Sequence, residues 1–223
     1  MPQGPFSHNL EDCSAGLLKS VYYVPEYISE AVHASLLQQI VSARTRWTQL
    51  SGRRLQNLGG SVHEKLGLLQ APIPTWLQPL VDRVGQDTGV YGAGSANHVL
   101  LNAYKPGEGI LAHQDGPLYF PGVCIVSLQA PAIIRFRRKG SDASADPVLS
   151  VACMPRSLLV FKDEAYEDCL HGIDEVTEEV IDASVANASA CGLAIGSGLP
   201  RGGERFSLTI RRVLKVRKNL LRL

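Results

Sequence analysis

Three residues in the second half of the chain have the types and spacing of a metal site. His113 and Asp115 are two positions apart, and on an extended chain side chains at i and i+2 point to the same face, so both can reach one ion. Two histidines and one carboxylate on a triangular face are the ligand set of non-haem Fe(II) oxygenases, which leave positions open for a cosubstrate and dioxygen. His171, one turn after the apolar stretch 157–161, is the best-placed third ligand.

The His-x-Asp spacing carries little weight by itself. Six histidines in 223 residues produce it easily by chance. An ordinary core or surface histidine is the simpler interpretation, and we apply it to His8, His33, His63 and His98. The metal prediction therefore needs support from the rest of the chain.

A second pattern, near the end of the chain, has the residues of a dicarboxylate site. Polar and apolar residues alternate over 205–211, and a period of two places the polar ones on one sheet face: Arg205, Ser207, Thr209 and Arg211. Turned inward, two guanidinium groups would hold a dicarboxylate through bidentate, charge-assisted hydrogen bonds. Asn102 and Tyr104, again two positions apart, would add an amide and a phenol. The alternative is an ordinary strand whose polar face meets solvent.

The elements that position these residues fall into two parts. Helices are predicted over 29–43, with Ser29 as N-cap, and over 75–88. Beyond residue 97, short apolar stretches alternate with Gly, Pro, Asp and Ser clusters, which is typical of an antiparallel sandwich or jelly roll; these stretches are 98–104, 123–129, 133–137, 148–151, 157–161 and 206–213, and VYYV at 21–24 adds a short strand. The prediction is an α+β, mainly β protein whose N-terminal helices pack on the sheet.

Three segments look irregular. Residues 1–18 are predicted to be a flexible arm, ahead of a single domain over 19–223. Residues 44–60 hold four arginines, one tryptophan and no acid, without a clean period, and are interpreted as a hairpin or irregular loop. Residues 183–203 are rich in Gly, Ala and Ser and are predicted to be a long mobile loop.

Composition excludes several classes of protein. The chain is 45% hydrophobic and 19% charged with a net charge of +1, which excludes a disordered or collagen-like chain. No apolar run approaches the ~18 residues of a membrane span, and five cysteines without a CxxC pair or a signal peptide indicate reduced thiols inside the cell. Residues 201–223 nevertheless carry eight basic residues against one acid. This basic tail is interpreted as a nuclear signal, a phosphate-binding edge or a solvated terminal strand.

Taken in order, these pieces resemble the AlkB family of Fe(II)/2-oxoglutarate dioxygenases. The family pattern is an Asn-x-Tyr strand, a Pro-Gly turn, His-x-Asp, a distal His and an Arg-x-Ser-Leu-Thr-x-Arg strand, and every element is present. The likeness covers about residues 20–215 and is greatest to a eukaryotic homologue, through stretches such as WTQLSGRRLQNLGG, ANHVLLNAY and SLTIRRV. It implies a double-stranded β-helix (jelly roll) core.

The resemblance also implies roles for these residues. His113, Asp115 and His171 would bind Fe(II), and the cosubstrates would be 2-oxoglutarate and O2. Arg205 would pair with the far carboxylate of 2-oxoglutarate, helped by Ser207 and Tyr104, and Thr209 shares their face. Arg211 and Asn102 would lie nearer the metal-bound end. The reaction implied is oxidative demethylation of N-methylated bases in RNA or single-stranded DNA.

The family places a substrate-recognition lid before the core, which corresponds here to about 44–60. Its arginines (Arg44, Arg46, Arg53 and Arg54) suit phosphate contacts and Trp47 suits base stacking, while Tyr119 and Phe120, after the metal motif, are candidates for the pocket lining. A solvated loop for the arginines and core positions for the aromatic residues are the competing interpretations. The bacterial namesake reads the base with an acid where this chain has Pro117. The substrate therefore stays open: a protein hydroxylase or demethylase and a weakly catalytic reader of modified nucleic acid are the alternatives. We expect a monomer, without a membrane partner, in cytoplasm and nucleus.

Overall fold

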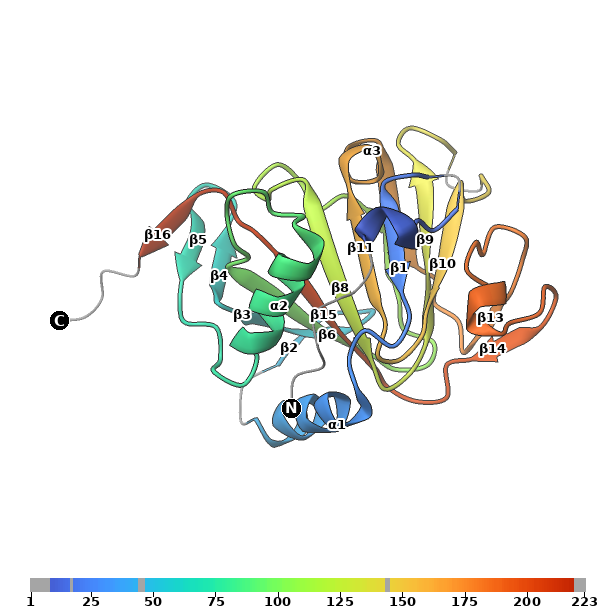
Figure 1. Cartoon of the computed structure of the whole chain (residues 1–223), viewed down its shortest axis with the longest axis horizontal. Coiled ribbons are helices and arrows are strands. Elements are labelled where there is room, and N and C mark those ends of the chain that lie inside the picture. The colour runs from blue at the N-terminus through green and yellow to red at the C-terminus, as the bar shows by residue number, and fades with distance from the viewer. Residues whose placement is uncertain (1–8, 17, 44–46, 143–144, 219–223) are drawn as a thin grey trace.

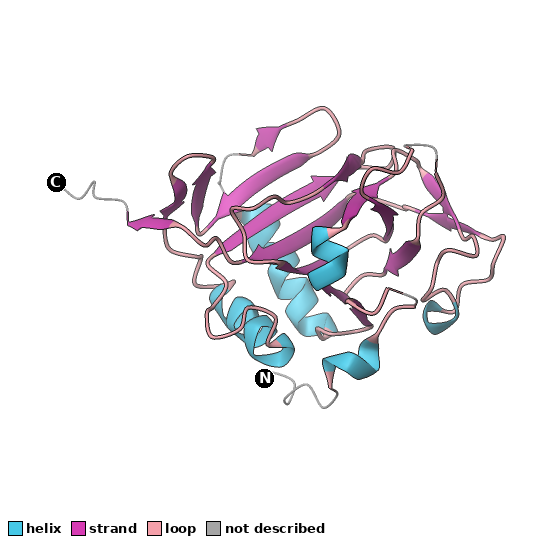
Figure 2. Ribbon diagram, turned by 90° about the horizontal axis from the view of Figure 1, so that it is seen from above, coloured by secondary structure: helices cyan, strands magenta, loops and turns pink. Residues whose placement is uncertain are grey.

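Two antiparallel sheets face each other and enclose the middle of the molecule (Figures 1 and 2). The computed structural model describes residues 9–16, 18–43, 47–142 and 145–218. The seven-stranded sheet has the order β1-β11-β8-β15-β6-β3-β2; its strands are β1 (Val21–Val24), β2 (Thr48–Gln49), β3 (Arg54–Leu58), β6 (His98–Tyr104), β8 (Gly122–Leu128), β11 (Leu158–Lys162) and β15 (Arg205–Arg211). The four-stranded sheet has the order β10-β9-β12-β7; its strands are β7 (Ile110–His113), β9 (Ala132–Arg138), β10 (Leu149–Cys153) and β12 (Cys169–Ile173).

Smaller elements surround this core. A three-stranded sheet has the order β16-β5-β4, with β4 (Gly60–His63), β5 (Gly67–Gln70) and β16 (Val216–Lys218), and β13 (Glu178–Val180) pairs with β14 (Gly198–Pro200). The helices are α1 (Glu30–Ser42), α2 (Gln78–Thr88) and the short α3 (Asp163–Glu167). None of the helices in the described part of the chain has the length and apolar character needed to cross a membrane.

The large sheet is buried on both faces, and each face has its own core. Alternate residues such as Val126, Leu208 and Ile210 pack against α1 and α2, whereas residues of the other parity, such as Ile125 and Leu159, pack toward the four-stranded sheet. Burial on both faces explains why β8 is apolar almost throughout. The jelly-roll prediction is confirmed, as is the packing of the N-terminal helices on the sheet.

The polar face of β15 is turned into the protein. Phe206, Leu208 and Ile210 belong to the core beneath the helices, so the opposite parity faces the space between the two sheets, and Arg205 and Arg211 are only 1% and 5% exposed. The alternative of a solvent-facing strand is thereby excluded. The predicted alternation therefore describes an inward-facing polar surface.

Several predicted elements need correction. The second helix begins at Gln78, three residues later than predicted, with a proline in its first turn. The hairpin prediction for 44–60 is confirmed by the pairing of β2 with β3, but β3 is also a full strand of the large sheet, paired with β6. Of the predicted arm, residues 9–16 pack on the core, with Leu10 and Ala15 buried; residues 1–8 and 17 lie outside the described residues.

The predicted loop at 183–203 is packed on the four-stranded sheet. The Asn187 side chain accepts a hydrogen bond from Ala152 N at 2.8 Å and donates to Ala152 O at 2.9 Å. Val185 and Leu199 belong to a small apolar cluster on the outer face of β9 and β10. These contacts hold the segment against the four-stranded sheet at Val185, Asn187 and Leu199. Its mobility stays a prediction.

A buried ionic cluster fixes the approach to β15. Arg201 Nη2 and Arg135 Nη2 donate to the Glu179 carboxylate at 2.6 and 3.3 Å, and Arg201 and Glu179 are each 1% exposed. Arg201 also donates to the backbone carbonyls of Glu108 and Asp174, at 3.0 and 2.7 Å. Those carbonyls lie just before β7 and just after β12. The cluster therefore joins β15 to the two strands that carry His113 and His171.

Removing the charge of Glu179 should destabilise the fold strongly. Glu179→Gln leaves the buried guanidinium of Arg201 without its carboxylate, while Arg135 keeps Asp174 at 2.6 Å; the unpaired buried charge costs about 3–5 kcal/mol in the free energy of unfolding. Urea unfolding followed by circular dichroism measures this difference. Arg138→Ala, which breaks the half-exposed Arg138–Glu164 pair, is the control and should change stability little. Equal effects of the two substitutions would show that the buried cluster does not hold the fold.

Candidate metal centre and cosubstrate cavity

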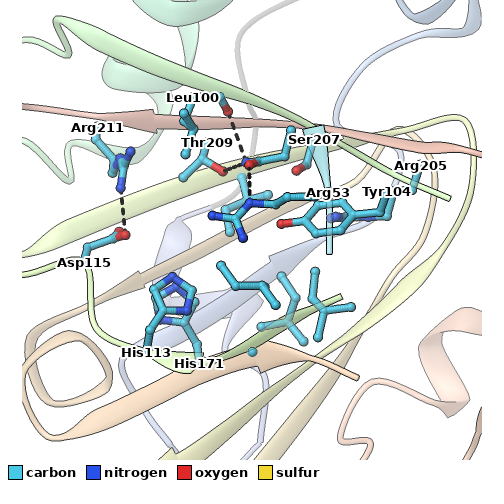
Figure 3. A pocket seen from close by; sticks show the side chains of 16 residues that line it. Arg53, Leu100, Tyr104, His113, Asp115, His171, Arg205, Ser207, Thr209 and Arg211 are labelled. Atoms are coloured by element: carbon cyan, nitrogen blue, oxygen red, sulfur yellow. Dashed lines mark hydrogen bonds and ion pairs between the residues drawn. The ribbon is translucent and has the colours of Figure 1, made fainter. Parts of the chain in front are cut away.

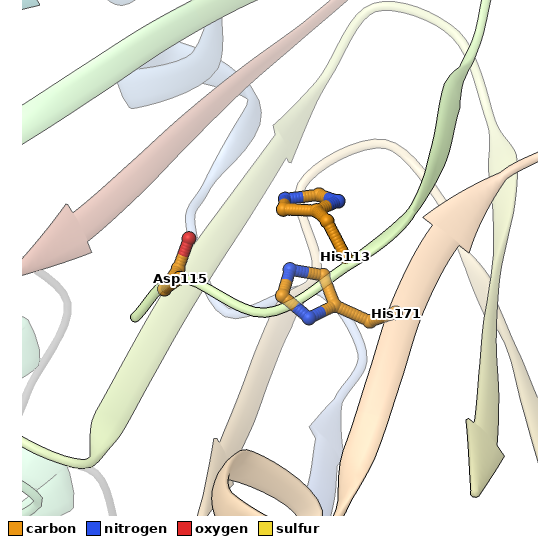
Figure 4. Close-up of side chains that lie close together, drawn as sticks. All are labelled: His113, Asp115 and His171. Carbon is orange, nitrogen blue, oxygen red and sulfur yellow. The ribbon is translucent and has the colours of Figure 1, made fainter. Parts of the chain in front are cut away.

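His113, Asp115 and His171 converge on one point between the sheets (Figure 4). His113 is the last residue of β7, His171 lies in β12, and the two are direct partners in the antiparallel register. Their ring centroids are 4.5 Å apart, and one ligand atom from each of the three side chains lies within 4.8 Å of the others. Strand pairing brings the distant histidine to the His-x-Asp segment.

The protonation states at this point suit a cation. Burial lowers the pKa of His171 to about 4, with Asp115 opposing the shift, so the ring is neutral near pH 7. His113 Nδ1 lies 2.9 Å from the carbonyl oxygen of Leu111, which can only accept, so Nδ1 is the donor of this hydrogen bond and Nε2 is the nitrogen left to face a metal ion. Neutral imidazoles with free lone pairs are what a metal requires.

Asp115 supplies the negative charge. Burial alone would raise the pKa of its carboxyl, but Arg211 and then the two imidazoles hold that pKa below its ordinary value. Arg211 Nη1 donates to Asp115 Oδ1 at 2.7 Å. The other oxygen, Oδ2, is buried and has no hydrogen-bond partner among the described residues. An orphaned carboxylate oxygen beside two imidazoles fits a divalent metal ion.

A cavity lined by the polar face of β15 adjoins this cluster (Figure 3). Arg205 lies at its end away from Asp115, is 1% exposed, and donates to Ser127 Oγ at 2.9 Å. Its Nε has no partner, and no carboxylate of the described residues lies within 4.0 Å of its guanidinium. A buried guanidinium without a counter-charge is costly. The cavity is therefore built for an anion.

The structure brings all six residues predicted for 2-oxoglutarate to this cavity: Asn102, Tyr104, Arg205, Ser207, Thr209 and Arg211. They meet because β6 and β15 pair with Tyr104 opposite Arg205 and Asn102 opposite Ser207. Burial raises the pKa of Tyr104, so its phenol stays a donor. Arg211 lies at the metal end and Arg205 at the other, which is the order that the family resemblance implies (Figure 3).

A second, more open pocket of about 410 Å³ also borders the metal cluster. Its lining includes His113, Asp115 and two of the predicted substrate residues, Arg53 and Tyr119. Arg211 connects the two sites, because its guanidinium carbon lies 4.1 Å from the centre of the Tyr119 ring while it also holds Asp115. The volume of the open pocket is within the range of small-molecule sites.

Trp47 and Arg54, also predicted as substrate residues, do not reach this pocket. Arg54 pairs with Glu204 at 2.8 Å and lies 4.4 Å above the Trp47 ring, and Trp47 packs near Phe206 on the helix side of the sheet. The reason is the period of two along β3, which sends Arg53 and Arg54 to opposite faces. Arg44 and Arg46 lie outside the described residues.

Sequence reasoning missed part of the pocket wall. Leu55 and Asn57 share the parity of Arg53 and line the pocket with it, as does Glu64 from the turn between β4 and β5. Asn57 Oδ1 lies 3.0 Å from Nε2 of His98, which is fully buried; burial and then Arg211 lower the pKa of His98 to about 3. The core interpretation of His98 is confirmed. The alternation Arg53, Leu55, Asn57 was the available signal.

The neighbouring arginines provide a sharp test of this geometry. Arg53→Ala should lower kcat/KM about tenfold to a hundredfold, because it removes a charged donor from both cavities, where Nε binds Asn102 Oδ1 at 3.1 Å. Arg54→Ala, the matched control, should leave kcat/KM nearly unchanged. Steady-state kinetics of succinate release measure both. The reverse order of effects would contradict the assignment of the two faces.

Comparison with known proteins identifies the class. The model of the 2OG-Fe(II) oxygenase superfamily matches residues 37–211, and the chain belongs to this superfamily, as an AlkB-type Fe(II)/2-oxoglutarate-dependent dioxygenase. It is 43% identical over 211 residues to the "Probable RNA/DNA demethylase ALKBH6" of Danio rerio, covering 90% of this chain and 89% of that protein. This agrees with the predicted likeness to a eukaryotic member of the AlkB family.

Two further relatives are more distant. "Uncharacterized protein L905" of Acanthamoeba polyphaga mimivirus is 27% identical over 197 residues, covering 86% of this chain and 84% of that protein. The solved structure of OsALKBH1 superposes with a TM-score of 0.53 over 86% of this chain and 98% of that one. At 13% identity, the latter shows the fold alone.

Proposed function

We propose that this dioxygenase removes N-methyl groups from bases of RNA or single-stranded DNA. The observation that carries the proposal is the position of Tyr119: its ring lines the open pocket next to the metal cluster, and Arg211 fixes both that ring and Asp115. A flipped base needs a flat side chain to stack on. The name of the 43% identical zebrafish relative agrees with this substrate class.

His113, Asp115 and His171 would hold Fe(II), with Arg205 and Tyr104 on the distant carboxylate of 2-oxoglutarate. When bound, iron and 2-oxoglutarate supply the oxidation, in which dioxygen converts 2-oxoglutarate to succinate and CO2 while the N-methyl carbon is hydroxylated and leaves as formaldehyde. The chain's own part is to hold the carboxylates, keep Asp115 ionised and orient the base.

Arg53 would act on both sides of the reaction centre. It lines the cosubstrate cavity and the open pocket, and it holds the Asn102 amide through Nε. Its remaining nitrogens are therefore placed to donate to a base or a phosphate. Pro117 stands where the bacterial namesake has the acid that reads the base. In this chain an acid lines the pocket from another element, because Glu64 lies on the turn between β4 and β5.

The monomeric state and the location in cytoplasm and nucleus stay predictions.

Mass spectrometry of a substrate panel tests the proposal. Methylated oligonucleotides, both RNA and single-stranded DNA, and methylated peptides are incubated with the protein, Fe(II) and 2-oxoglutarate. Loss of a methyl mass from an oligonucleotide, with release of formaldehyde, is the expected result. Modification of peptides alone would favour the protein hydroxylase or demethylase instead. Binding of modified oligonucleotides without turnover would favour the reader of modified nucleic acid.

A further inference from the structure

Of the eight cations predicted as one basic tail, Arg201 and Arg205 are buried, as described above, and the other six differ in their positions. Arg211 enters the site, as described above. Arg212 turns inward, where Nη1 donates to the carbonyl of Tyr91 at 3.0 Å and the guanidinium lies 5.5 Å from the Phe120 ring centre. Lys215 and Arg217 are exposed. The side chain of Lys218 and the whole of Arg222 lie outside what the structure describes. Only the middle of the tail is therefore shown to offer charge to a partner.

The exposed cations are held beside the open pocket. Leu214 N donates to the carbonyl of Leu118, a pocket-lining residue, at 3.0 Å, so the chain leaves the pocket wall directly into β16. β16 then runs parallel to β5, and Lys215 Nζ donates to the carbonyl of Lys65 at 3.0 Å. Lys65 follows Glu64, another pocket-lining residue.

The backbone at the start of β5 lets the segment before β16 come very close. Gly67, at φ +80°, places its Cα against the carbonyl oxygen of Lys215, where a Cβ would collide, and Leu68 N donates to that same oxygen at 2.8 Å. Only glycine combines this φ with so close a contact. The small sheet projects at one end of the molecule, beyond the large sheet (Figure 1). The position of β16 is thus fixed by the fold.

We call Lys65, Lys215 and Arg217 the basic edge. Within the described residues, none of the three has a carboxylate within the 4.0 Å of an ion pair. The segments 60–70 and 214–217 contain one acid, Glu64. Among the other exposed cations of the described residues, Arg138 pairs with a carboxylate, whereas Lys19, Lys105 and Lys139 form no ion pair but do not line the open pocket or its neighbouring strand β5. The edge therefore presents uncompensated positive charge next to the pocket mouth.

We propose that the basic edge binds the phosphate backbone of the single strand whose base enters the open pocket. The inference rests on the proposed function and adds the surface that holds the polymer. Cations beside a base pocket can contact phosphates flanking the base, and each such contact releases a condensed counterion. This explains how a chain with a net charge of +1 can bind nucleic acid: the required charge is local.

The test is salt-dependent binding of a fluorescein-labelled oligothymidylate, followed by fluorescence anisotropy. For single strands the slope of log K against log salt concentration is about −0.7 per phosphate contact. Lys215→Ala/Arg217→Ala should make the slope shallower by about 1.4 and weaken binding at low salt. Lys19→Ala/Lys139→Ala removes two exposed lysines from other parts of the surface and should leave slope and affinity unchanged. Thermal unfolding checks that both variants fold.

The outcomes separate this proposal from the proposed function. If the wild-type protein demethylates oligonucleotides but the two double variants bind with the same slope, the basic edge is wrong and the function stands. If the wild-type protein neither binds nor demethylates any oligonucleotide, both fail. If Lys215→Ala/Arg217→Ala weakens binding of labelled polyglutamate but not of oligothymidylate, the edge serves an acidic polypeptide and the proposal is overturned.

Discussion

Asp115→Ala should reduce 2-oxoglutarate-dependent succinate formation to the background level. The carboxylate is the negatively charged member of the cluster, and its loss leaves two imidazoles beside the guanidinium of Arg211, which then lacks its carboxylate partner. A positive charge in place of a carboxylate would also repel a divalent cation. Succinate release measured with and without added Fe(II), together with the iron content of the purified protein, records both losses.

The control for this substitution is Asp82→Ala, at an exposed position of α2. It should keep full turnover and full iron content. Circular dichroism separates loss of the metal from loss of the fold. Turnover by Asp115→Ala at the wild-type rate in added iron would show that Asp115 is not a ligand.

Arg205→Met should have two effects of opposite sign. The guanidinium is buried without a carboxylate partner in the described residues, so replacing it with an apolar side chain of similar length should raise the free energy of unfolding of the ligand-free protein. The same change removes the partner of an incoming carboxylate. The KM for 2-oxoglutarate should therefore rise roughly a few hundredfold.

Thermal unfolding with and without 2-oxoglutarate measures both effects in one experiment. The wild-type protein should gain stability from 2-oxoglutarate, in proportion to the ligand bound. Arg205→Met should begin at a higher Tm and gain almost nothing. A lower starting Tm combined with an undiminished gain from 2-oxoglutarate would contradict the role assigned to Arg205.

The polar face of β15 was predictable because one parity of a single strand carries the information. Phe206, Leu208 and Ile210 require a core, so their neighbours must face the other way. Whether that other face met solvent or a cavity could not be read from residues 205–211. The answer depends on a second sheet whose strands β7 and β12 are short.

The residues that line the open pocket were less predictable, again because the environment of each face of a strand depends on elements distant in the sequence. Within 47–58, strand β2 is two residues long and the apolar residues follow no simple period. The alternation of Arg53, Leu55 and Asn57 was therefore too weak a signal to assign the two faces of β3 and to separate Arg53 from Arg54. Arg201 shows the limit more clearly. Its position in a basic run suggests a solvated cation, but Glu179 and two backbone carbonyls draw it into the core.

The most direct test of the account is a crystal structure grown without oxygen in the presence of Fe(II) and 2-oxoglutarate, with anomalous diffraction recorded at the iron edge. We expect one strong anomalous peak within bonding distance of His113, Asp115 and His171, and a 2-oxoglutarate whose distant carboxylate meets Arg205. An iron peak held by other side chains, or a 2-oxoglutarate that leaves Arg205 unpaired, would contradict it.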